Sequence, residues 1–178
     1  PTLSRDWREG LEASARRARR EFLVETAAAL GCVKVALGHH RGDQAETLLQ
    51  RLLRGTGSSG LRAMQPWAPP FIRPLLPFAR EQLQRFLAEH GWPFIEDASN
   101  RDPRFTRNRI RHQLLPLLES FNPRIEEHLY RLSERFSVEE DFWREKEDEA
   151  LRKVILDRAD GMSLSRGLLL ELHPALLP

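Results

Sequence analysis

Two histidines and two carboxylates are concentrated in one short stretch of the chain. The histidines are His39 and His40, and the carboxylates are Asp43 and Glu46. Imidazole exchanges protons near neutral pH and carboxylates hold cationic groups, so this density of polar side chains is typical of a catalytic or binding site.

A strand before this stretch and a helix after it are expected to position these side chains. Residues 33–37 are β-branched and mostly apolar, which predicts a short buried strand. The leucines within 44–54 recur at helical spacing, which predicts an amphipathic helix. The polar stretch therefore lies where a strand ends and a helix begins, the edge at which open α/β sheets bind ligands.

The same residues also fit an ordinary helix start. Asp43 and Glu46 are three residues apart, as in a capping box, and the helix dipole stabilises carboxylates in a first turn. A histidine pair can also be satisfied by backbone carbonyls. Sequence physics alone does not separate capping from a functional site, although the adjacent histidines favour the site.

Motifs in the same order along roughly residues 10–145 resemble one enzyme family. The pattern Gly-His-His-x-x-Asp-Gln-x-Glu-Thr at 38–47, then Arg-Gly-Thr-Gly at 54–57, is similar to the signature of the tRNA(Ile)-lysidine synthases. These are N-type ATP pyrophosphatases that attach lysine to the wobble cytidine of an isoleucine tRNA. Further matching segments are 12–17, 60–64, 72–76, 96–100, 107–111, 114–116 and 122–123.

Two features depart from the family pattern. The family's phosphate loop, Ser-Gly-Gly-x-Asp-Ser, does not occur in the sequence. We therefore expect a fragment that lacks the start of the nucleotide-binding domain, binds ATP very weakly and is inactive by itself. Gly42 stands where family members usually carry a second aspartate, which puts a metal-linked role of that position in question.

A glycine-rich segment at 55–60 imitates a phosphate loop in composition. A phosphate loop follows a strand and opens a helix, whereas this segment follows the end of a helix. It is expected to stop that helix and to form a flexible connection. Arg54, just before it, either contacts phosphate or compensates the helix dipole in the last turn.

Composition limits the class of protein. The 178 residues are 40% hydrophobic and 30% charged, with a mean hydropathy of −0.51, which is typical of a soluble protein. No apolar run approaches the roughly 20 residues of a membrane span, so no membrane association is expected. The single cysteine, Cys32, excludes an intrachain disulfide and fits the cytoplasm; a buried core position is expected for it.

The net charge is only +2, but basic residues gather in one segment. Five arginines between 101 and 111 accompany a single acid, Asp102. With Phe105, Asn100 and Asn108 between them, they predict a surface that binds nucleic acid. The alternative is a helix whose arginines only pair with Glu96, Asp97 or Glu119.

The expected fold class is α/β, with a mainly helical remainder. The resemblance implies that residues 1–65 are the C-terminal part of an ATP-pyrophosphatase domain, with a Rossmann-type parallel sheet of the adenine nucleotide alpha hydrolase type. Prolines interrupt the connection at 66–79, and 80–178 are mainly helical. Helices are predicted at 11–30, 80–90, 107–120 and from Pro123 toward Leu156, with a break near Pro116 and a cap at Asn122.

The resemblance implies a reaction and residue roles. ATP would adenylate the C2 oxygen of the wobble cytidine of tRNA(Ile) with a CAU anticodon, and L-lysine would then displace AMP. Mg²⁺ would accompany ATP, with no residue assigned as its ligand. The implied catalytic residues are His39, His40, Asp43 and Arg107; the lysine ligands are Asp43 and Glu46; the ATP contacts are His39 and Arg54; the tRNA contacts are Arg101, Arg104, Arg109 and Arg111.

Two other functions stay open from the sequence. One is a different ATP-pyrophosphatase tRNA-modifying enzyme, such as a thiolation enzyme, although those commonly use several cysteines. The other is a non-catalytic helical RNA-binding module, if the phosphate loop is truly absent. The oligomeric state is also open, with a homodimer as one option.

Overall fold

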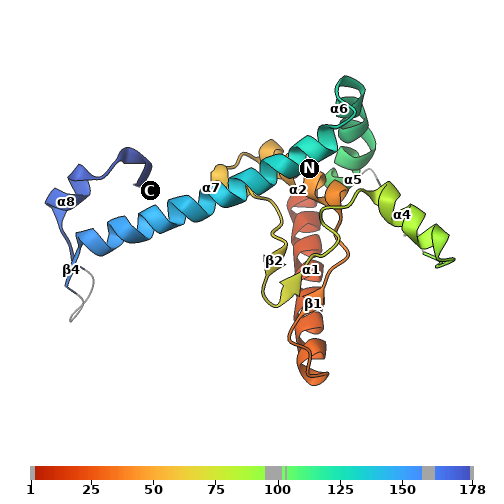
Figure 1. Cartoon of the computed structure of the whole chain (residues 1–178), viewed down its shortest axis with the longest axis horizontal. Helices are drawn as coiled ribbons and strands as arrows, with labels where there is room; N and C mark the ends of the chain where they lie inside the picture. The colour runs from red at the N-terminus through yellow and green to blue at the C-terminus, as the bar shows by residue number, and fades with distance from the viewer. Residues whose placement is uncertain (1–2, 95–101, 103, 158–162, 177–178) are drawn as a thin grey trace. The chain divides into compact units, whose positions relative to one another are not determined.

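The computed structural model describes residues 3–94, 102, 104–157 and 163–176. The chain divides into two compact units, one formed by Pro1–Asp43 and Gln65–Ile95 and the other by Gln44–Met64 and Glu96–Pro178. Figure 1 shows the elements of both units and labels the larger ones. The division passes through α2 (Arg41–Arg54), whose first turn belongs to the first unit.

The first unit holds a three-stranded sheet with the order β1-β3-β2. β1 (Val35–Ala36) runs parallel to β3 (Phe71–Ile72), and α2 lies between them in the sequence. β2 (Trp67–Ala68) pairs antiparallel with β3 through a turn that contains the cis bond Pro69–Pro70. The predicted strand and helix are present, and the strand parallel to β1 lies within 66–79, where only a connection interrupted by prolines was predicted. The sheet is mixed because the tight turn brings β2 back alongside β3.

α1 (Leu3–Ala29) precedes the sheet and ends at Gly31, which has a φ of 66°. The N–H of Cys32 still bonds to the Ala27 carbonyl, so the chain leaves the helix in a tight turn at the surface. The predicted buried strand at 33–37 is therefore too long, since Val33 is 84% exposed. The predicted burial of Cys32 is wrong for the same reason, because its side chain is exposed.

α4 (Arg80–Glu89) closes the first unit along the sequence. Its start is held by the Ala79 N–H, which donates to Gln82 Oε1 at 2.8 Å, and Gly91 follows its end with a φ of 66°. The helix predicted at 80–90 is present, but none of its residues is buried, and Phe86 is 50% exposed.

The second unit is built mainly from helices. After the rest of α2 come α3 (Ser58–Leu61), α5 (Thr106–Arg109), the π-helical turn η2 (Ile110–Leu114), α6 (Leu115–Phe121) and α7 (Ile125–Val154). β4 (Ile155–Asp157) then pairs antiparallel with β5 (Ser163–Leu164), followed by α8 (Arg166–Glu171) and η3 (Pro174–Leu176). No helix among the described residues has both the length and the apolar character that crossing a membrane requires.

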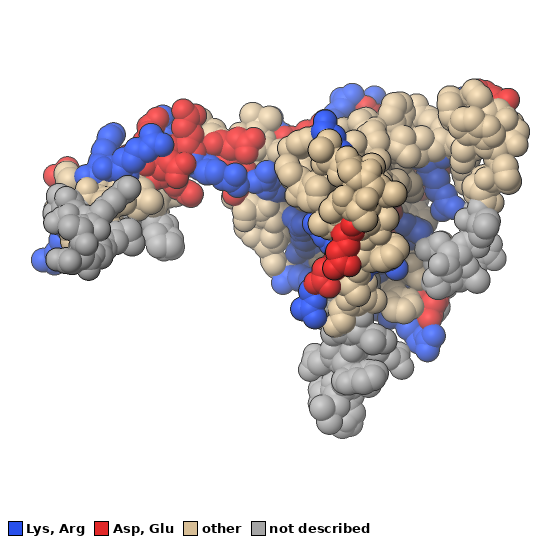
Figure 2. All heavy atoms as spheres, turned by 90° about the horizontal axis from the view of Figure 1, so that it is seen from below, with Lys and Arg blue, Asp and Glu red and all other residues tan. Residues whose placement is uncertain are grey.

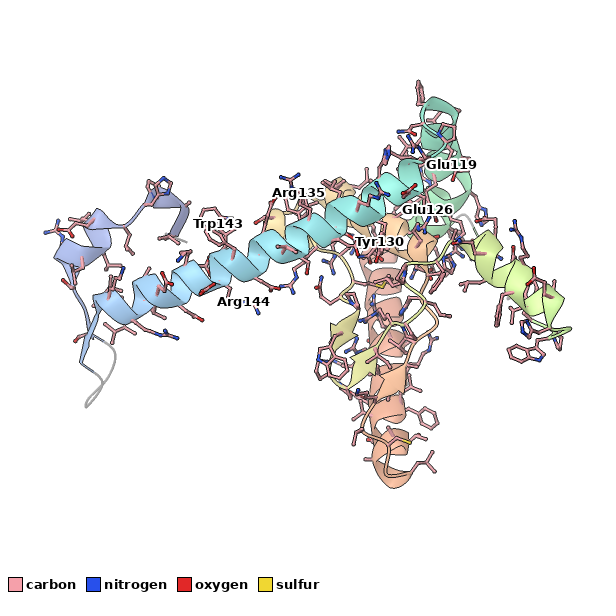
Figure 3. The ribbon with its side chains drawn as sticks, viewed as in Figure 1. Glu119, Glu126, Tyr130, Arg135, Trp143 and Arg144 are labelled. Atoms are coloured by element: carbon pink, nitrogen blue, oxygen red, sulfur yellow. The ribbon has the colours of Figure 1, made fainter. Side chains whose placement is uncertain are left out.

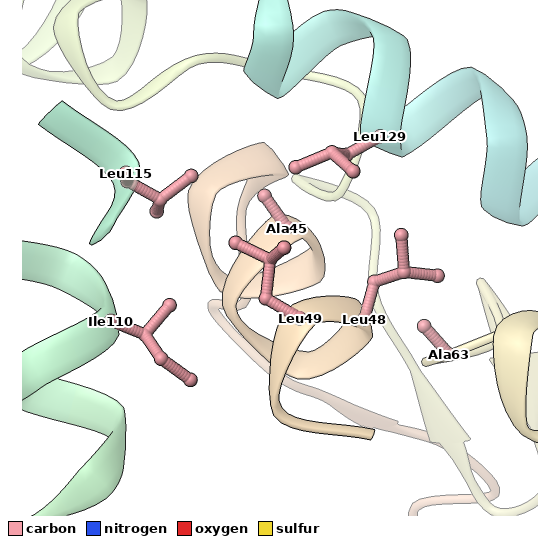
Figure 4. Close-up of a cluster of buried hydrophobic side chains, with 7 residues drawn as sticks. All are labelled: Ala45, Leu48, Leu49, Ala63, Ile110, Leu115 and Leu129. Atoms are coloured by element: carbon pink, nitrogen blue, oxygen red, sulfur yellow. The ribbon is translucent and has the colours of Figure 1, made fainter. Parts of the chain in front are cut away.

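One hydrophobic cluster organises this unit, and Figure 4 shows its members. α2 contributes Ala45, Leu48 and Leu49, of which the first two are completely buried. The remaining members are Ala63, Ile110, Leu115 and Leu129. The apolar face of α2 predicted from its leucine spacing therefore packs on the helices that carry the arginines of 107–111.

Pro116 explains the π-helical turn between α5 and α6. Proline has no N–H to donate and its ring crowds the preceding turn, so a regular α-helix cannot pass through it unchanged. The Leu115 N–H reaches back to the Ile110 carbonyl, five residues earlier. The predicted break near Pro116 is thus a local widening of a continuous helical run.

α7 begins as the sequence predicts, because Asn122 Oδ1 accepts the Arg124 N–H at 3.0 Å. Its buried positions include Leu129 and Ser133, whereas Leu132 is 40% exposed. Along this helix Lys and Arg alternate with Asp and Glu (Figure 2), for example in the pair Arg135–Glu139 at 3.0 Å. Trp143 and Arg144 point to different sides of it (Figure 3).

Candidate functional site

The first turn of α2 is held by two hydrogen bonds of His40, one to Gly42 and one to Asp43. The Gly42 N–H donates to His40 Nδ1 at 3.1 Å, and the His40 N–H donates to Asp43 Oδ2 at 2.9 Å. This arrangement is similar to a capping box, with histidine in the place of Ser or Thr and aspartate in the place of Glu, although the His40 ring accepts the N–H of Gly42 and not that of Asp43. The box lies three residues earlier than the Asp43–Glu46 pattern predicted, because α2 begins at Arg41.

The cap also fixes the tautomer of His40. Since Nδ1 accepts a backbone hydrogen bond, the neutral ring carries its proton on Nε2, which lies 3.6 Å from Asp43 Oδ2. The structure therefore places both side chains in contact with one another and with the backbone of the turn. Capping accounts for this contact, and catalytic roles of both residues stay predictions.

Glu46 occupies a different environment, in the second unit. Its side chain is 2% exposed and accepts hydrogen bonds from two arginines that lie 61 and 65 residues later in the sequence. Arg107 Nε reaches Oε2 at 2.6 Å. Arg111 bridges both carboxylate oxygens, with Nε 2.5 Å from Oε1 and Nη2 3.1 Å from Oε2.

Among the described residues, this cluster joins one carboxylate to two guanidiniums. A carboxylate offers about four lone-pair directions, and the hydrogen bonds to Arg107 and Arg111 occupy three of them. The side chain of Arg107 is 33% exposed, so the cluster faces solvent through that residue.

The five arginines of 101–111 do not form one uniform basic surface. Arg104 pairs with Asp102 through Nε and Nη2, with Nε 2.8 Å from Oδ2, and this hydrogen bonding raises the pKa of Arg104. Arg107 and Arg111 pair with Glu46. Arg109 is exposed and forms no ion pair with any residue that the structure describes. Arg101 lies outside the described residues.

The two predicted ATP contacts are found at opposite ends of the motif. His39 is partly buried, lies three residues after the end of β1 and belongs to the first unit. Arg54 is exposed in the last turn of α2, in the second unit, where a cation compensates the helix dipole. Gly55 then ends the helix with a φ of 80°, as the sequence predicts, and the segment after it contains the short helix α3.

Sequence reasoning missed a buried amide beside the carboxylates. Gln44 is 2% exposed and exchanges two hydrogen bonds with the backbone of Met64, each at 3.0 Å. Its Nε2 also donates to Ser133 Oγ at 2.9 Å, which ties α2 to α7. The burial of this glutamine could have been predicted from the sequence, because it lies inside the motif at a position that the leucine spacing predicts to be buried.

Comparisons with known proteins agree with the motifs. A family model described as the PP-loop domain matches residues 3–118. The chain belongs to the PP-loop domain family. Domains of this family have an adenine nucleotide alpha hydrolase-like fold.

Several curated relatives carry the name tRNA(Ile)-lysidine synthase. The relative from Thermotoga sp. (strain RQ2) is 43% identical over 132 residues, which are 74% of this chain and 32% of that protein. The relative from Geobacter sulfurreducens is 43% identical over 159 residues, 88% of this chain and 34% of that protein. The Geobacillus kaustophilus relative is 36% identical over 177 residues, 97% of this chain and 38% of that protein.

The resemblance inferred from the motifs is confirmed by these matches. The chain spans about a third of the length of the relatives that it matches.

Proposed function

We propose that the chain is part of a ligase that uses ATP to attach lysine to the wobble cytidine of a tRNA(Ile) with a CAU anticodon. The proposal is supported by 43% identity, over 88% of the chain, to a protein named tRNA(Ile)-lysidine synthase. It is also supported by the position of the motif, which follows β1 and opens α2, because ligands of open α/β sheets bind where strands end.

The reaction proceeds in two balanced steps. The C2 oxygen of cytidine attacks the α-phosphorus of ATP, and pyrophosphate leaves. The amine of lysine then attacks C2, a proton is lost from nitrogen, and AMP leaves with the former C2 oxygen. The first step needs cations around phosphates, and the second needs carboxylates that hold a cationic amino acid.

The roles of individual residues follow from these needs. His39, His40, Asp43 and Arg107 act in catalysis, Asp43 and Glu46 hold lysine, and His39 and Arg54 contact ATP. Arg101, Arg104, Arg109 and Arg111 contact tRNA. The exposed Arg109, which has no ion pair within the described residues, is the most direct support for an RNA contact.

Mg²⁺ accompanies ATP in this proposal. The described residues contain no group of three His, Cys, Asp or Glu side chains that could hold a metal ion. Magnesium usually takes one or two carboxylates together with phosphate oxygens, so the ion would be held mainly by the nucleotide. No step is derived through it.

The remaining parts of the proposal concern architecture and location. The parallel pair of β1 and β3 belongs to a Rossmann-type sheet. Residues 1–65 form part of the nucleotide-binding domain, 66–79 are the connection, and 80–178 are the mainly helical remainder. The enzyme works in the cytoplasm, and a homodimer is one option for its assembly.

Incorporation of labelled lysine into a transcript of tRNA(Ile) with a CAU anticodon tests this function. The full-length gene product should incorporate lysine only when ATP is present, and cytidine at the wobble position should be required. Replacing that cytidine by uridine is the matched control. Modification with sulfur in place of lysine would overturn the proposal in favour of a thiolation enzyme.

A further inference from the structure

The buried side chain of Gln44 is fixed in one orientation by its hydrogen bonds inside the second unit. Its Oε1 accepts the Met64 N–H and its Nε2 donates to the Met64 carbonyl, each at 3.0 Å. Nε2 also donates to Ser133 Oγ at 2.9 Å, and that hydroxyl donates to the Tyr130 carbonyl at 2.7 Å. Because the Ser133 hydroxyl spends its proton on Tyr130, the amide nitrogen and not the amide oxygen must face it.

These hydrogen bonds hold a turn that the backbone alone disfavours. Ala63, directly before Met64, has a φ of 47°, in the left-handed region that residues other than glycine rarely adopt. Its side chain is buried in the hydrophobic cluster around α2. Such a conformation persists only where the surrounding structure over-determines it, and functional sites are where it is most often found. The amide of Gln44 on one side and the packing of Ala63 on the other supply that constraint here.

Gln44 and Glu46 lie on different sides of α2. They are two residues apart, which is about 200° around an α-helix. Figure 4 shows the same division of the cluster, with Ala63 on one side of α2 and Ile110 and Leu115 on the other. The amide therefore ties α2 to α7 and to the turn after α3, and the carboxylate accepts its two arginines on the opposite side.

The geometry of the Glu46 cluster depends on the rotation of α2 about its axis. The Nε atoms of Arg107 and Arg111 lie 2.6 and 2.5 Å from the carboxylate oxygens, and hydrogen bonds weaken steeply as their angles change. A side chain at the surface of a helix lies roughly 5–6 Å from the axis, so a rotation of about 10° moves it by about 1 Å. Apolar contacts such as those of Leu48 have no preferred direction, whereas the hydrogen bonds of Gln44 do.

We infer that Gln44 is a positioning residue for the Glu46 cluster. By fixing the rotation of α2 against Met64 and Ser133, it holds the carboxylate of Glu46 where the two arginines meet it. Its consequence for lysine rests on the proposed function, in which Glu46 holds the amino acid. Gln44 then sets the affinity for lysine without touching it.

Urea unfolding of the 178-residue chain tests the positioning without any substrate. Arg111→Met should lower the folding equilibrium constant about fivefold less in the Gln44→Met background than in the parent, because the pair that it breaks is already displaced. Gln50→Met, on the same helix and half-buried, is the matched control and should leave the effect of Arg111→Met unchanged. Ser133→Ala removes the tie to α7 and keeps the bonds to Met64, so it should show a smaller coupling, and it decides if Gln44→Met does not fold.

The KM for lysine of the full-length gene product tests the consequence for binding. Gln44→Met should raise it about tenfold and keep the KM for ATP within about twofold, whereas a residue that only stabilises the fold would leave both unchanged. The inference is wrong if the effects of Gln44→Met and Arg111→Met on unfolding simply add, if Gln50→Met couples as strongly, or if an active Gln44→Met enzyme keeps the parent's KM for lysine. A full-length product that does not incorporate lysine would overturn the proposed function instead, and the unfolding experiment alone would then decide the inference.

Discussion

Asp43 and Glu46 are two carboxylates of the same helix, three residues apart, yet one has its partner in the same turn and the other has partners far away in the sequence. Asp43 bonds to His40 in its own turn. Glu46 bonds to Arg107 and Arg111, which lie more than 60 residues away in the sequence. The first carboxylate stabilises a local helix start, and the second joins two distant parts of the second unit. Equal spacing in a motif therefore does not imply an equal physical role.

Removing the charge of Glu46 should have the largest effect on stability. Glu46→Gln leaves two guanidiniums at a buried position without their carboxylate, which costs about 3–5 kcal/mol. Urea denaturation measures this loss. Glu139→Gln, which breaks the exposed pair with Arg135, is the control and should cost about 0.5 kcal/mol or less. If Glu46→Gln cost as little as Glu139→Gln, Glu46 would stabilise the fold no more than an exposed ion pair does, and this account of Glu46 would be wrong.

The two arginines should differ when each is replaced by lysine. Arg111 contacts both oxygens of Glu46, whereas Arg107 contacts one through Nε. Lysine cannot reproduce a two-point contact, so Arg111→Lys should cost about 1.5–3 kcal/mol and Arg107→Lys about 1 kcal/mol. Denaturation midpoints of the two variants compare them directly. The opposite order would mean that the bridging geometry of Arg111 contributes little.

Breaking the His40–Asp43 cap should have a smaller effect than breaking the Glu46 cluster. Asp43→Ala and His40→Ala should each cost about 1 kcal/mol, as expected for a lost helix cap. Because the two residues act together, the double variant should cost less than the sum of the single variants. Strict additivity in thermal unfolding would show that they do not form one unit.

The smallest expected effects concern RNA binding by the exposed arginines. Arg109→Ala should lower the slope of log affinity against log salt by roughly 0.9, because one phosphate contact is lost. Arg104→Ala should lower it less, since Asp102 already neutralises Arg104. Filter binding of tRNA over a series of salt concentrations measures both slopes. Equal slopes in both variants and the parent would exclude this segment from the RNA contact.

Local patterns in the sequence predicted the local parts of this structure. The leucine spacing of α2, the Asn122 cap and the glycine after Arg54 are each determined by neighbours within a few residues. The boundaries of β1 and the exposure of Cys32 were mispredicted, because the turn after α1 extends to Cys32. The β-branched and apolar residues at 33–37 predicted a strand, but nothing in their pattern showed that the turn after α1 reaches Cys32.

The pairing of the arginines could not be predicted in the same way. Counting charges within 101–111 suggested a surface with almost no acids. Two of the acids considered as partners, Glu96 and Asp97, lie outside the described residues. Among the described residues, Glu46 pairs with both Arg107 and Arg111, and the packing of α2 against Ile110 and Leu115 brings it close. Long-range ion pairs depend on tertiary packing, which spacing along one chain does not contain.

A double-mutant cycle between Glu46 and Arg111 tests the central claim, that a buried carboxylate of the motif is held by arginines of a distant helix. Unfolding free energies would be measured for the parent, Glu46→Gln, Arg111→Met and the double variant. The structure predicts a coupling free energy of about 2–3 kcal/mol, within the range found for residues in direct contact. Losses that simply add, with a coupling below about 0.5 kcal/mol, would contradict the claim.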